Sequence, residues 1–198
     1  MESMEIAERL QAQFPDRVLD IRSFHGQVGV ITRREQVVDM LHWLRDTPGI
    51  LMNHLMDLCG VDNAKRNDDS LQRFEVVYNL YSVPERHSLR IRAQVPEEDP
   101  CIDSITSLWA GADWHERECF DLMGISFTGH ENMKRILLPE DWQGHPLRKE
   151  YPLKGRQEWS GMVDLLHKVE KLQEFSFSGA ENQAPGSPSS QTRENKKT

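Results

Sequence analysis

Apolar and polar positions near the start of the chain follow patterns that predict one helix and then two strands. Apolar residues recur at helical spacing over residues 2–13, which predicts a short helix. Two β-rich runs follow, at residues 18–24 and 27–31, and His25 and Gly26 separate them. Because a two-residue connection containing glycine is typical of a tight turn, these runs predict a β-hairpin.

The next stretch predicts a helix followed by an ambiguous apolar run. Thr32 and Glu35 stand three residues apart just before an apolar periodic run that begins at Val37, which predicts a capping box at the start of an amphipathic helix. Residues 47–49 close that helix. The run 50–58 mixes apolar and polar residues and could be strand or helix, and we favour a strand.

The clearest alternation predicts a pair of antiparallel strands. Apolar and polar residues alternate over residues 74–81, after a polar loop at 62–70, and alternate again over residues 88–95. Such a pair buries one side and turns the other toward water. Arg90 and Arg92 fall on the second side, and we interpret them as solvated surface residues.

Helical spacing returns after a break that contains prolines. It predicts one helical segment over residues 102–109 and another over 112–123, with Gly124 where a helix-ending glycine belongs. Strands joined by short turns, with a few helices and no strict β-α-β alternation, indicate an α+β domain with a mostly antiparallel sheet and packed helices.

The pattern divides the chain into three parts. Residues 1–155 form the predicted α+β domain. Residues 156–175 form an extension, in which an apolar stripe beginning after Ser160 predicts an amphipathic helix. Residues 176–198 are rich in Ser, Gly, Pro, Gln and Asn, and they predict a disordered tail.

Composition narrows the classes of function. The formal net charge of −8 argues against a general nucleic-acid binder, which needs clustered Lys and Arg to neutralise phosphates. No apolar run reaches the roughly 18 to 20 residues that span a bilayer. The N-terminal sequence lacks the apolar core of a secretory signal. We therefore expect a cytosolic protein, or one that sits on a membrane complex without entering the bilayer.

The cysteines and histidines predict no metal or cofactor in this chain. Cys59, Cys101 and Cys119 lie far apart, whereas iron–sulfur clusters and structural zinc sites usually need four closely spaced ligands. His115 and Cys119 stand one helical turn apart and suggest a rival interpretation, a stand-alone metal-dependent hydrolase. The motif lacks the second histidine of HExxH and any identifiable third ligand, so we prefer a buried face that these two residues share with Ala112 and Met123.

Charged residues in the stretch 114–153 point to recognition and not to catalysis. No nucleophile motif or phosphate-binding glycine loop accompanies the carboxylates. Asp113, Arg117 and Asp121 instead form an i, i+4, i+8 ladder, and exposed pairs of this kind add only about 0.3–0.5 kcal/mol each. Since stability explains such a ladder poorly, we expect an exposed recognition surface.

The second half of this stretch is rich in the residue types that anchor interfaces, such as Trp142, Arg148 and Tyr151. Prolines and glycines stiffen it, which lowers the entropy lost on docking. The stretch therefore predicts a docking surface and not an active site.

Two linked motifs in this stretch resemble a known family. ERECFDLM is followed after six residues by His130, then by KRIL and PEDWQGHPLRKEYPL. This spacing resembles the thirty-kilodalton subunit, called the C-subunit in bacteria, of respiratory complex I, the proton-translocating NADH:quinone oxidoreductase. The motifs cover about forty residues, and the likeness extends over roughly residues 1–155.

The resemblance implies a subunit that performs no chemistry itself. Members of the family belong to the hydrophilic arm of the enzyme, at the cytoplasmic face of the bacterial inner membrane. They pack against the forty-nine-kilodalton-type subunit (the bacterial D-subunit), here called the quinone-site subunit, and against neighbouring iron–sulfur subunits. FMN, iron–sulfur clusters and quinone are expected in those partners. The interface positions that the resemblance implies are Glu116, Arg117, Glu118, Asp121, His130, Lys134, Arg135, Asp141, Trp142, His145, Arg148, Lys149 and Tyr151.

The resemblance leaves one alternative of the same general class. Membrane-bound hydrogenases and ferredoxin-driven relatives of complex I contain a similar subunit. The motifs alone therefore leave the electron donor and the type of quinone open.

Overall fold

The computed structural model describes residues 2–154 and 161–174. The chain divides into two units, Met1–Gly155 and Arg156–Thr198. The helices are α1 (Ser3–Gln13), α2 (Val37–Asp46), α3 (Ala112–Met123) and α4 (Met162–Glu174). The strands are β1 (Val18–Phe24), β2 (Gln27–Arg33), β3 (His54–Asp62), β4 (Phe74–Tyr81), β5 (Ser88–Val95), β6 (Cys101–Asp103) and β7 (Ser126–Thr128).

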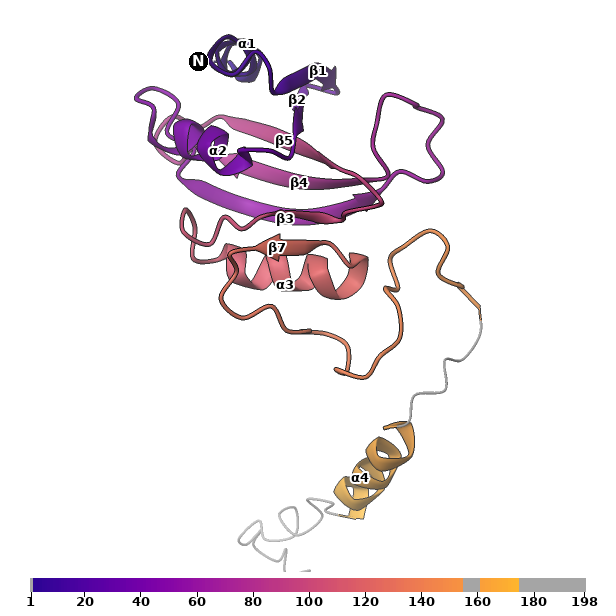
Figure 1. Cartoon of the computed structure of the whole chain (residues 1–198). Coiled ribbons are helices and arrows are strands. Elements are labelled where there is room, and N and C mark those ends of the chain that lie inside the picture. The colour runs from indigo at the N-terminus through magenta and orange to yellow at the C-terminus, as the bar shows by residue number, and fades with distance from the viewer. Residues whose placement is uncertain (1, 155–160, 175–198) are drawn as a thin grey trace, which may run out of the picture. The chain divides into compact units, whose positions relative to one another are not determined.

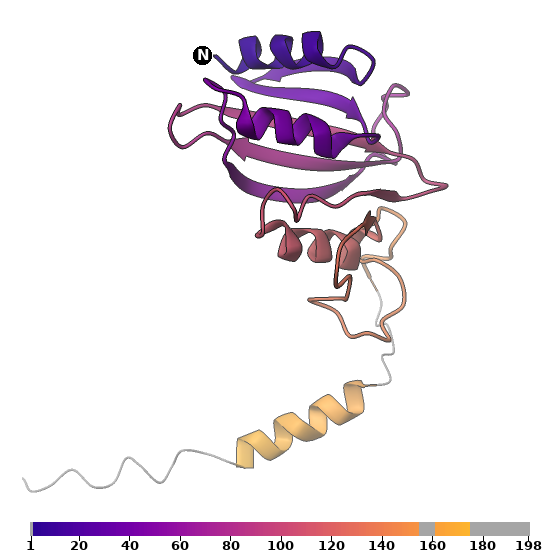
Figure 2. The same ribbon diagram turned by 60° about the vertical axis from the view of Figure 1, so that its left-hand side comes forward.

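The centre of the first unit is a five-stranded sheet in the order β1-β2-β5-β4-β3. All neighbouring strands are antiparallel except β2 and β5, which are parallel. Helices α1 and α2 lie on one face of this sheet (Figures 1 and 2). Their apolar side chains form the core together with that face of the sheet and with buried residues of α3, β6 and β7, and Tyr78 and Ile91 are fully buried in it. The predicted α+β fold with a mostly antiparallel sheet is confirmed.

The first hairpin and the helix before it are confirmed. The turn between β1 and β2 consists of His25 and Gly26, with φ angles of 49° and 77°. Two consecutive positive φ angles give a turn whose twist matches that of the paired strands, and glycine reaches them without steric strain.

Helix α2 is confirmed, but its predicted capping box is wrong. Thr32 lies inside β2, is fully buried, and pairs with Ala93 of β5. The residue at the start of α2 is Gln36, whose φ is 58° and whose side chain makes no capping hydrogen bond. Because Thr32 is paired within the sheet, it does not cap the helix. Gln36, in the left-handed conformation, leads the chain into α2 instead.

The strand interpretation of residues 50–58 holds from His54 onward. Strand β3 continues to Asp62, further than the apolar run indicates. Before it, the backbone N–H groups of Ile50 and Leu51 both donate to the carbonyl of Thr47, each at 3.0 Å. These hydrogen bonds place the first residues of the run in a turn.

The helix predicted for residues 102–109 is wrong. Ile102 belongs to the short strand β6 and pairs with Phe127 of β7 in a parallel arrangement. After it, the N–H groups of Leu108 and Trp109 donate to the carbonyl of Ile105, which makes a turn and not a helix. Both Ile102 and Ile105 are buried, so the same apolar spacing comes from a strand followed by a turn.

Helix α3 ends at Gly124, whose φ is 73°, as predicted. It packs beside β3 (Figure 1), and the closest approach is at Gly60. A Cβ atom on Gly60 would lie 2.8 Å from Met123 Cγ and 2.9 Å from Cys119 Sγ, so this close approach requires glycine. The predicted buried face of α3 is confirmed for Ala112, Cys119 and Met123, whereas His115 is partly exposed.

The open side of the β4–β5 pair differs from a solvated surface. Arg92 donates to both carboxylate oxygens of Glu75, and the Glu75 side chain is fully buried. The side chain of Arg92 is 15% exposed, so its interpretation as a solvated residue is wrong. Arg90 is partly exposed and donates to the side-chain oxygens of Asn79 and Gln27.

The helix predicted in the extension is confirmed as α4, whose apolar side chains Met162, Leu165, Leu166, Val169 and Leu172 are exposed. The predicted disordered tail at 176–198 lies outside the described residues. Among residues 2–154 and 161–174, no helix is both long and apolar enough to cross a membrane.

Candidate docking surface

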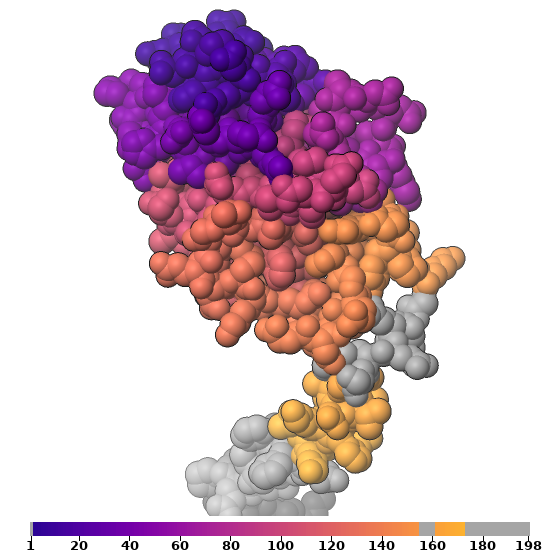
Figure 3. Space-filling view, in the orientation of Figure 1, coloured from indigo at the N-terminus to yellow at the C-terminus, as the bar shows by residue number. Residues whose placement is uncertain are grey.

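A segment without regular secondary structure covers α3. Residues 129–154, all of which the structure describes, form no helix or strand, and we call them the α3 loop. In the space-filling view their orange atoms form a continuous layer against the rest of the domain (Figure 3). Because such a segment lacks its own backbone ladder, other groups must hold it in one conformation.

The carboxylate of Asp121, on α3, provides the main attachment. Its Oδ2 accepts the backbone N–H groups of Ile136, Leu137 and Leu138 at 3.0, 2.8 and 2.9 Å. Its Oδ1 accepts Arg135 at 2.7 Å. Burial alone would raise the pKa of Asp121, but these hydrogen bonds together lower it below its ordinary value. The site therefore holds a carboxylate anion inside the protein.

Arg135 and His145 extend this attachment along the loop. Arg135 also donates to the carbonyl of Trp142 at 3.0 Å. The Nδ1 atom of His145 lies 3.0 Å from the backbone carbonyl of Asp121. Burial lowers the pKa of His145, and the charge of Arg148 nearby acts in the same direction. Neutral His145 therefore serves as a hydrogen-bonding group within the fold.

The end of the α3 loop is tied to both α3 and the sheet. Arg148 Nε donates to the carbonyl of Met123 at 2.7 Å, and its guanidinium lies 5.0 Å from the ring centre of Phe74. The backbone N–H of Lys149 donates to Asp62 Oδ2 at 2.8 Å. Burial opposes ionisation of Asp62, but its bonds with Arg73, Lys149 and Ala64 lower its pKa. The loop is thus attached at two places by charged groups.

The predicted charged ladder on α3 is wrong as an exposed surface. Asp121 is fully buried and pairs with Arg135. Arg117 lies 3.9 Å from Asp113 and donates to the carbonyl of Lys134 at 3.1 Å. The residues share a helix face, but that face lies under the α3 loop. Spacing alone cannot show that another segment covers a face.

Glu116, a predicted interface residue, is also fully buried. Its Oε1 accepts the backbone N–H of Ile105 at 2.7 Å, and within the described residues its Oε2 has no hydrogen-bond partner. Burial raises the pKa of Glu116 above its ordinary value. Glu116 shapes the turn after β6, so it affects any partner only indirectly.

The other predicted interface residues divide by exposure. Exposed side chains belong to Glu118, Lys134, Asp141 and Lys149. Partly exposed residues are Arg117, Arg135, Trp142, His145, Arg148 and Tyr151, whereas the side chain of His130 is only 1% exposed. His130 turns inward, with Nε2 3.1 Å from Asp113 Oδ1. The outer surface therefore carries only part of the predicted set.

Sequence reasoning missed four exposed apolar side chains on this surface. Trp114 is 61% exposed, Leu137 is 61% exposed, Leu147 is 54% exposed and Leu153 is 97% exposed. Exposed large apolar groups close to charged ones are typical of protein interfaces. A signal was present for Trp114, because it stands one helical turn before the exposed Glu118.

The rival metal site finds no geometric support. His115 Nδ1 lies 3.6 Å from Asp57 Oδ1, whereas Cys119 is buried against Gly60. Burial raises the pKa of Cys119, which opposes the thiolate that a metal requires. Among the described residues, no group of three or more His, Cys, Asp or Glu side chains could hold a metal ion.

The fold is similar to that of two solved structures. One solved structure, described as Nqo5 of the trypsin-resistant fragment (1-134), has a TM-score of 0.57 and 32% identity and covers 67% of this chain and 99% of that chain. Another, from the membrane-bound sulfane sulfur reductase, an archaeal respiratory membrane complex, has a TM-score of 0.59 over 87% and 94% of the two chains. At 17% identity, this second likeness shows the fold alone.

Proteins of similar sequence show which family this chain belongs to. A family described as "Respiratory-chain NADH dehydrogenase, 30 Kd subunit" matches residues 30–157. A protein of Roseiflexus sp. (strain RS-1) is 46% identical over 77% of this chain and 86% of its own length. A Geobacter sulfurreducens protein is 43% identical over 78% and 94%. Both are named as the C-subunit of NADH-quinone oxidoreductase. This chain belongs to that respiratory-chain NADH dehydrogenase subunit family, and the hydrogenase alternative is not favoured.

Proposed function

We propose that this protein is the cofactor-free, peripheral-arm subunit of a proton-translocating NADH:quinone oxidoreductase, and that α3 and the α3 loop dock on its quinone-site subunit. Membership of the NADH dehydrogenase subunit family and relatives named as the C-subunit of NADH-quinone oxidoreductase support the assignment to this enzyme. The protein then lies at the cytoplasmic face of the bacterial inner membrane and contacts the membrane only through the complex.

The observation that carries the docking proposal is a fixed loop with exposed apolar side chains. The backbone of Leu137 is held by Asp121, yet its side chain is 61% exposed. Trp114 is equally exposed on the helix that the loop covers. A surface held in one conformation before binding loses little entropy on docking, which favours a permanent interface.

In this role the protein contributes to catalysis by position alone. FMN, the iron–sulfur clusters and quinone are carried by partner subunits, and this chain holds the quinone-site subunit in place. Small displacements of positioned groups can lower reaction rates about a hundredfold, so an indirect contribution of this kind can still be large.

The test replaces one exposed apolar side chain with a charged one. Leu137→Glu in an affinity-tagged chain expressed in its own cells is expected to reduce recovery of the quinone-site subunit by at least about tenfold, because interface anchors carry most of the binding energy. Val83→Glu is the matched control, since Val83 is 58% exposed in the turn between β4 and β5. Equal recovery with both variants would refute docking through the α3 loop.

A further inference from the structure

The face of the sheet opposite α1 and α2 contains a hollow with a volume of about 390 Å³. Its side chains come from the positions that alternate with the core. On β4, for example, Glu75 and Val77 line the hollow, while Val76 and Tyr78 lie in the core. Four arginines line it, namely Arg22, Arg66, Arg90 and Arg92. We call this hollow the arginine hollow.

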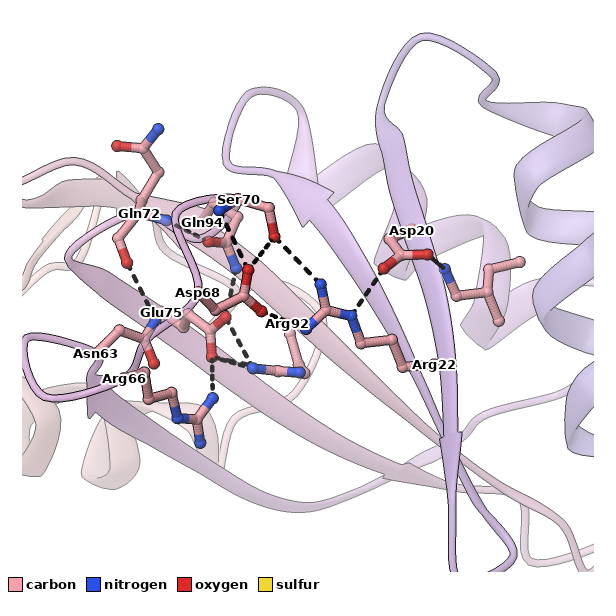
Figure 4. Close-up of polar contacts among 11 residues, drawn as sticks. Asp20, Arg22, Asn63, Arg66, Asp68, Ser70, Gln72, Glu75, Arg92 and Gln94 are labelled. Carbon is pink, nitrogen blue, oxygen red and sulfur yellow. Dashed lines mark hydrogen bonds and ion pairs between the residues drawn. The ribbon is translucent and has the colours of Figure 1, made fainter.

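One fully buried carboxylate lies among these arginines. Glu75 accepts Arg92 at 2.8 Å and Gln94 at 2.6 Å, and Arg66 approaches it at 4.0 Å (Figure 4). A buried carboxylate held in this way is already compensated. Glu75 therefore fixes Arg92 at the base of the hollow and leaves Arg66, whose side chain is 50% exposed, weakly held.

The arginines differ in how their charge is balanced. Arg22 has two carboxylates, Asp20 and Asp68, each at 2.7 Å. Arg90 donates to neutral amide oxygens, those of Asn79 at 2.8 Å and Gln27 at 3.0 Å. Amide oxygens satisfy its hydrogen bonds but leave its positive charge uncompensated. Arg90 and Arg66 thus present unbalanced positive charge on a chain whose net charge is −8.

Apolar groups accompany this charge. Val77 and Phe24 both line the hollow. Val77 is buried, whereas Phe24 is 76% exposed. Arginine beside an exposed aromatic ring is a combination enriched in protein interfaces. Guanidinium groups also match the planar geometry of a carboxylate.

We propose that the arginine hollow receives a segment of a neighbouring subunit that places an Asp or Glu side chain between Arg90 and Arg66 and an apolar side chain against Phe24. Charge complementarity selects this occupant, and membership of a respiratory-complex family supplies the neighbours. The site uses the sheet and none of the α3 loop, so it stands independently of docking on the quinone-site subunit through that loop.

Photocrosslinking in the assembled complex tests the occupant. Phe24 is replaced by p-benzoylphenylalanine in a tagged chain, and the crosslinked peptide is sequenced by mass spectrometry. The expected product is a peptide of another subunit with Asp or Glu near the crosslinked residue, in lower yield in about 1 M salt, where the screening length falls to about 3 Å. A peptide without acidic residues, a phospholipid adduct, or no crosslink overturns the proposal.

Charge reversal tests the role of Arg90. Arg90→Glu is expected to lower the crosslink yield about tenfold, and changing the crosslinked acid of the partner to Lys is expected to restore it. Arg86→Glu, on an exposed turn of the same sheet, is the matched control and leaves the yield unchanged. Arg90→Gln removes the charge but keeps a polar side chain, so an unchanged yield in this variant overturns the proposal even if Arg90→Glu fails to fold.

Discussion

The surface formed by α3 and its loop and the open face of the sheet are both organised around a fully buried carboxylate. Asp121 holds Arg135 at 2.7 Å, and Glu75 holds Arg92 at 2.8 Å. The remaining donors differ. Around Asp121 they are three backbone N–H groups of the loop, whereas around Glu75 they are side chains of a regular sheet and its adjoining loop.

This difference gives the two carboxylates different structural effects. Backbone donors fix the path of a chain, so Asp121 determines the shape of the α3 loop and uses its charge inside the protein. Side-chain donors leave the strand unchanged, so Glu75 arranges cations at the surface of the arginine hollow. Charge within the α3 region is therefore mainly structural, whereas charge in the arginine hollow remains available for binding.

The largest expected effect comes from removing Asp121. Asp121→Ala leaves Arg135 and three N–H groups without their acceptor, and we expect the free energy of unfolding of the full chain to fall by about 3–5 kcal/mol in urea titrations. Because its folded pKa is lowered, the stabilisation by Asp121 is complete above its ordinary pKa of about 3.9 and is lost as pH falls through the folded value. Glu118→Ala, on the exposed side of α3, should change stability by less than about 0.5 kcal/mol. Similar losses of stability for Asp121→Ala and Glu118→Ala would contradict the structural role of the Asp121 charge.

Charge reversal is expected to cost more stability at Arg148, in the α3 loop, than at Arg90, in the arginine hollow. Both losses are smaller than that expected from removing Asp121. Arg148→Glu loses the bond to the Met123 carbonyl and the contact with Phe74, so we expect a loss of about 2–3 kcal/mol. Arg90→Glu should lower stability by less than about 1 kcal/mol, because Arg90 has only neutral partners among the described residues. Thermal and urea unfolding of the full chain would measure both losses of stability.

Lys149→Glu is the control for Arg148→Glu. Its side chain is exposed, and it contributes to the fold through its backbone N–H. We expect a change within about 0.5 kcal/mol. If Lys149→Glu were as unstable as Arg148→Glu, a general effect of added negative charge would explain both.

The sequence predicted the elements whose pattern is local. The alternation of β4 and β5 and the glycine that ends α3 are read within one stretch, and the structure confirms them. The helix predicted at 102–109 failed because a strand followed by a turn places Ile102 and Ile105 in the core as effectively as a helix would. Apolar spacing reports burial and cannot distinguish these conformations over so short a stretch.

The sequence predicted which charged residues share a face of α3 but not what covers that face. Spacing on α3 correctly placed Asp113, Arg117 and Asp121 on one face, yet the partner of Asp121 stands 14 residues away, in a loop without periodicity. Glu75 is similar, because a polar residue at an alternating position was expected to face water. Whether a charged side chain is buried depends on partners that lie far away in the sequence. The spacing of residues does not identify those partners.

Glu116 is another fully buried carboxylate, and changing it has the smallest expected effect. Unlike Asp121 and Glu75, it has no arginine partner within the described residues, and burial raises its pKa. Its contribution to stability is therefore complete below its ordinary pKa of about 4.3 and is lost as pH rises through the higher folded value. Glu116→Gln keeps an oxygen for the N–H of Ile105 and cannot ionise.

We therefore expect Glu116→Gln to gain stability relative to the unmodified chain as pH rises from about 4 to 7, measured as the difference between their urea midpoints at each pH. Asp121→Asn is the matched comparison. It loses a charge that the folded protein favours, so its loss of stability is expected to stay nearly constant from about pH 4 to 7 and to shrink only as pH falls below the ordinary pKa of about 3.9. A difference for Glu116→Gln that stays constant with pH would mean that Glu116 ionises as easily in the folded chain as in the unfolded chain. In that case burial without a cation would not separate Glu116 from Asp121 and Glu75, and the classification of these carboxylates by their partners would fail.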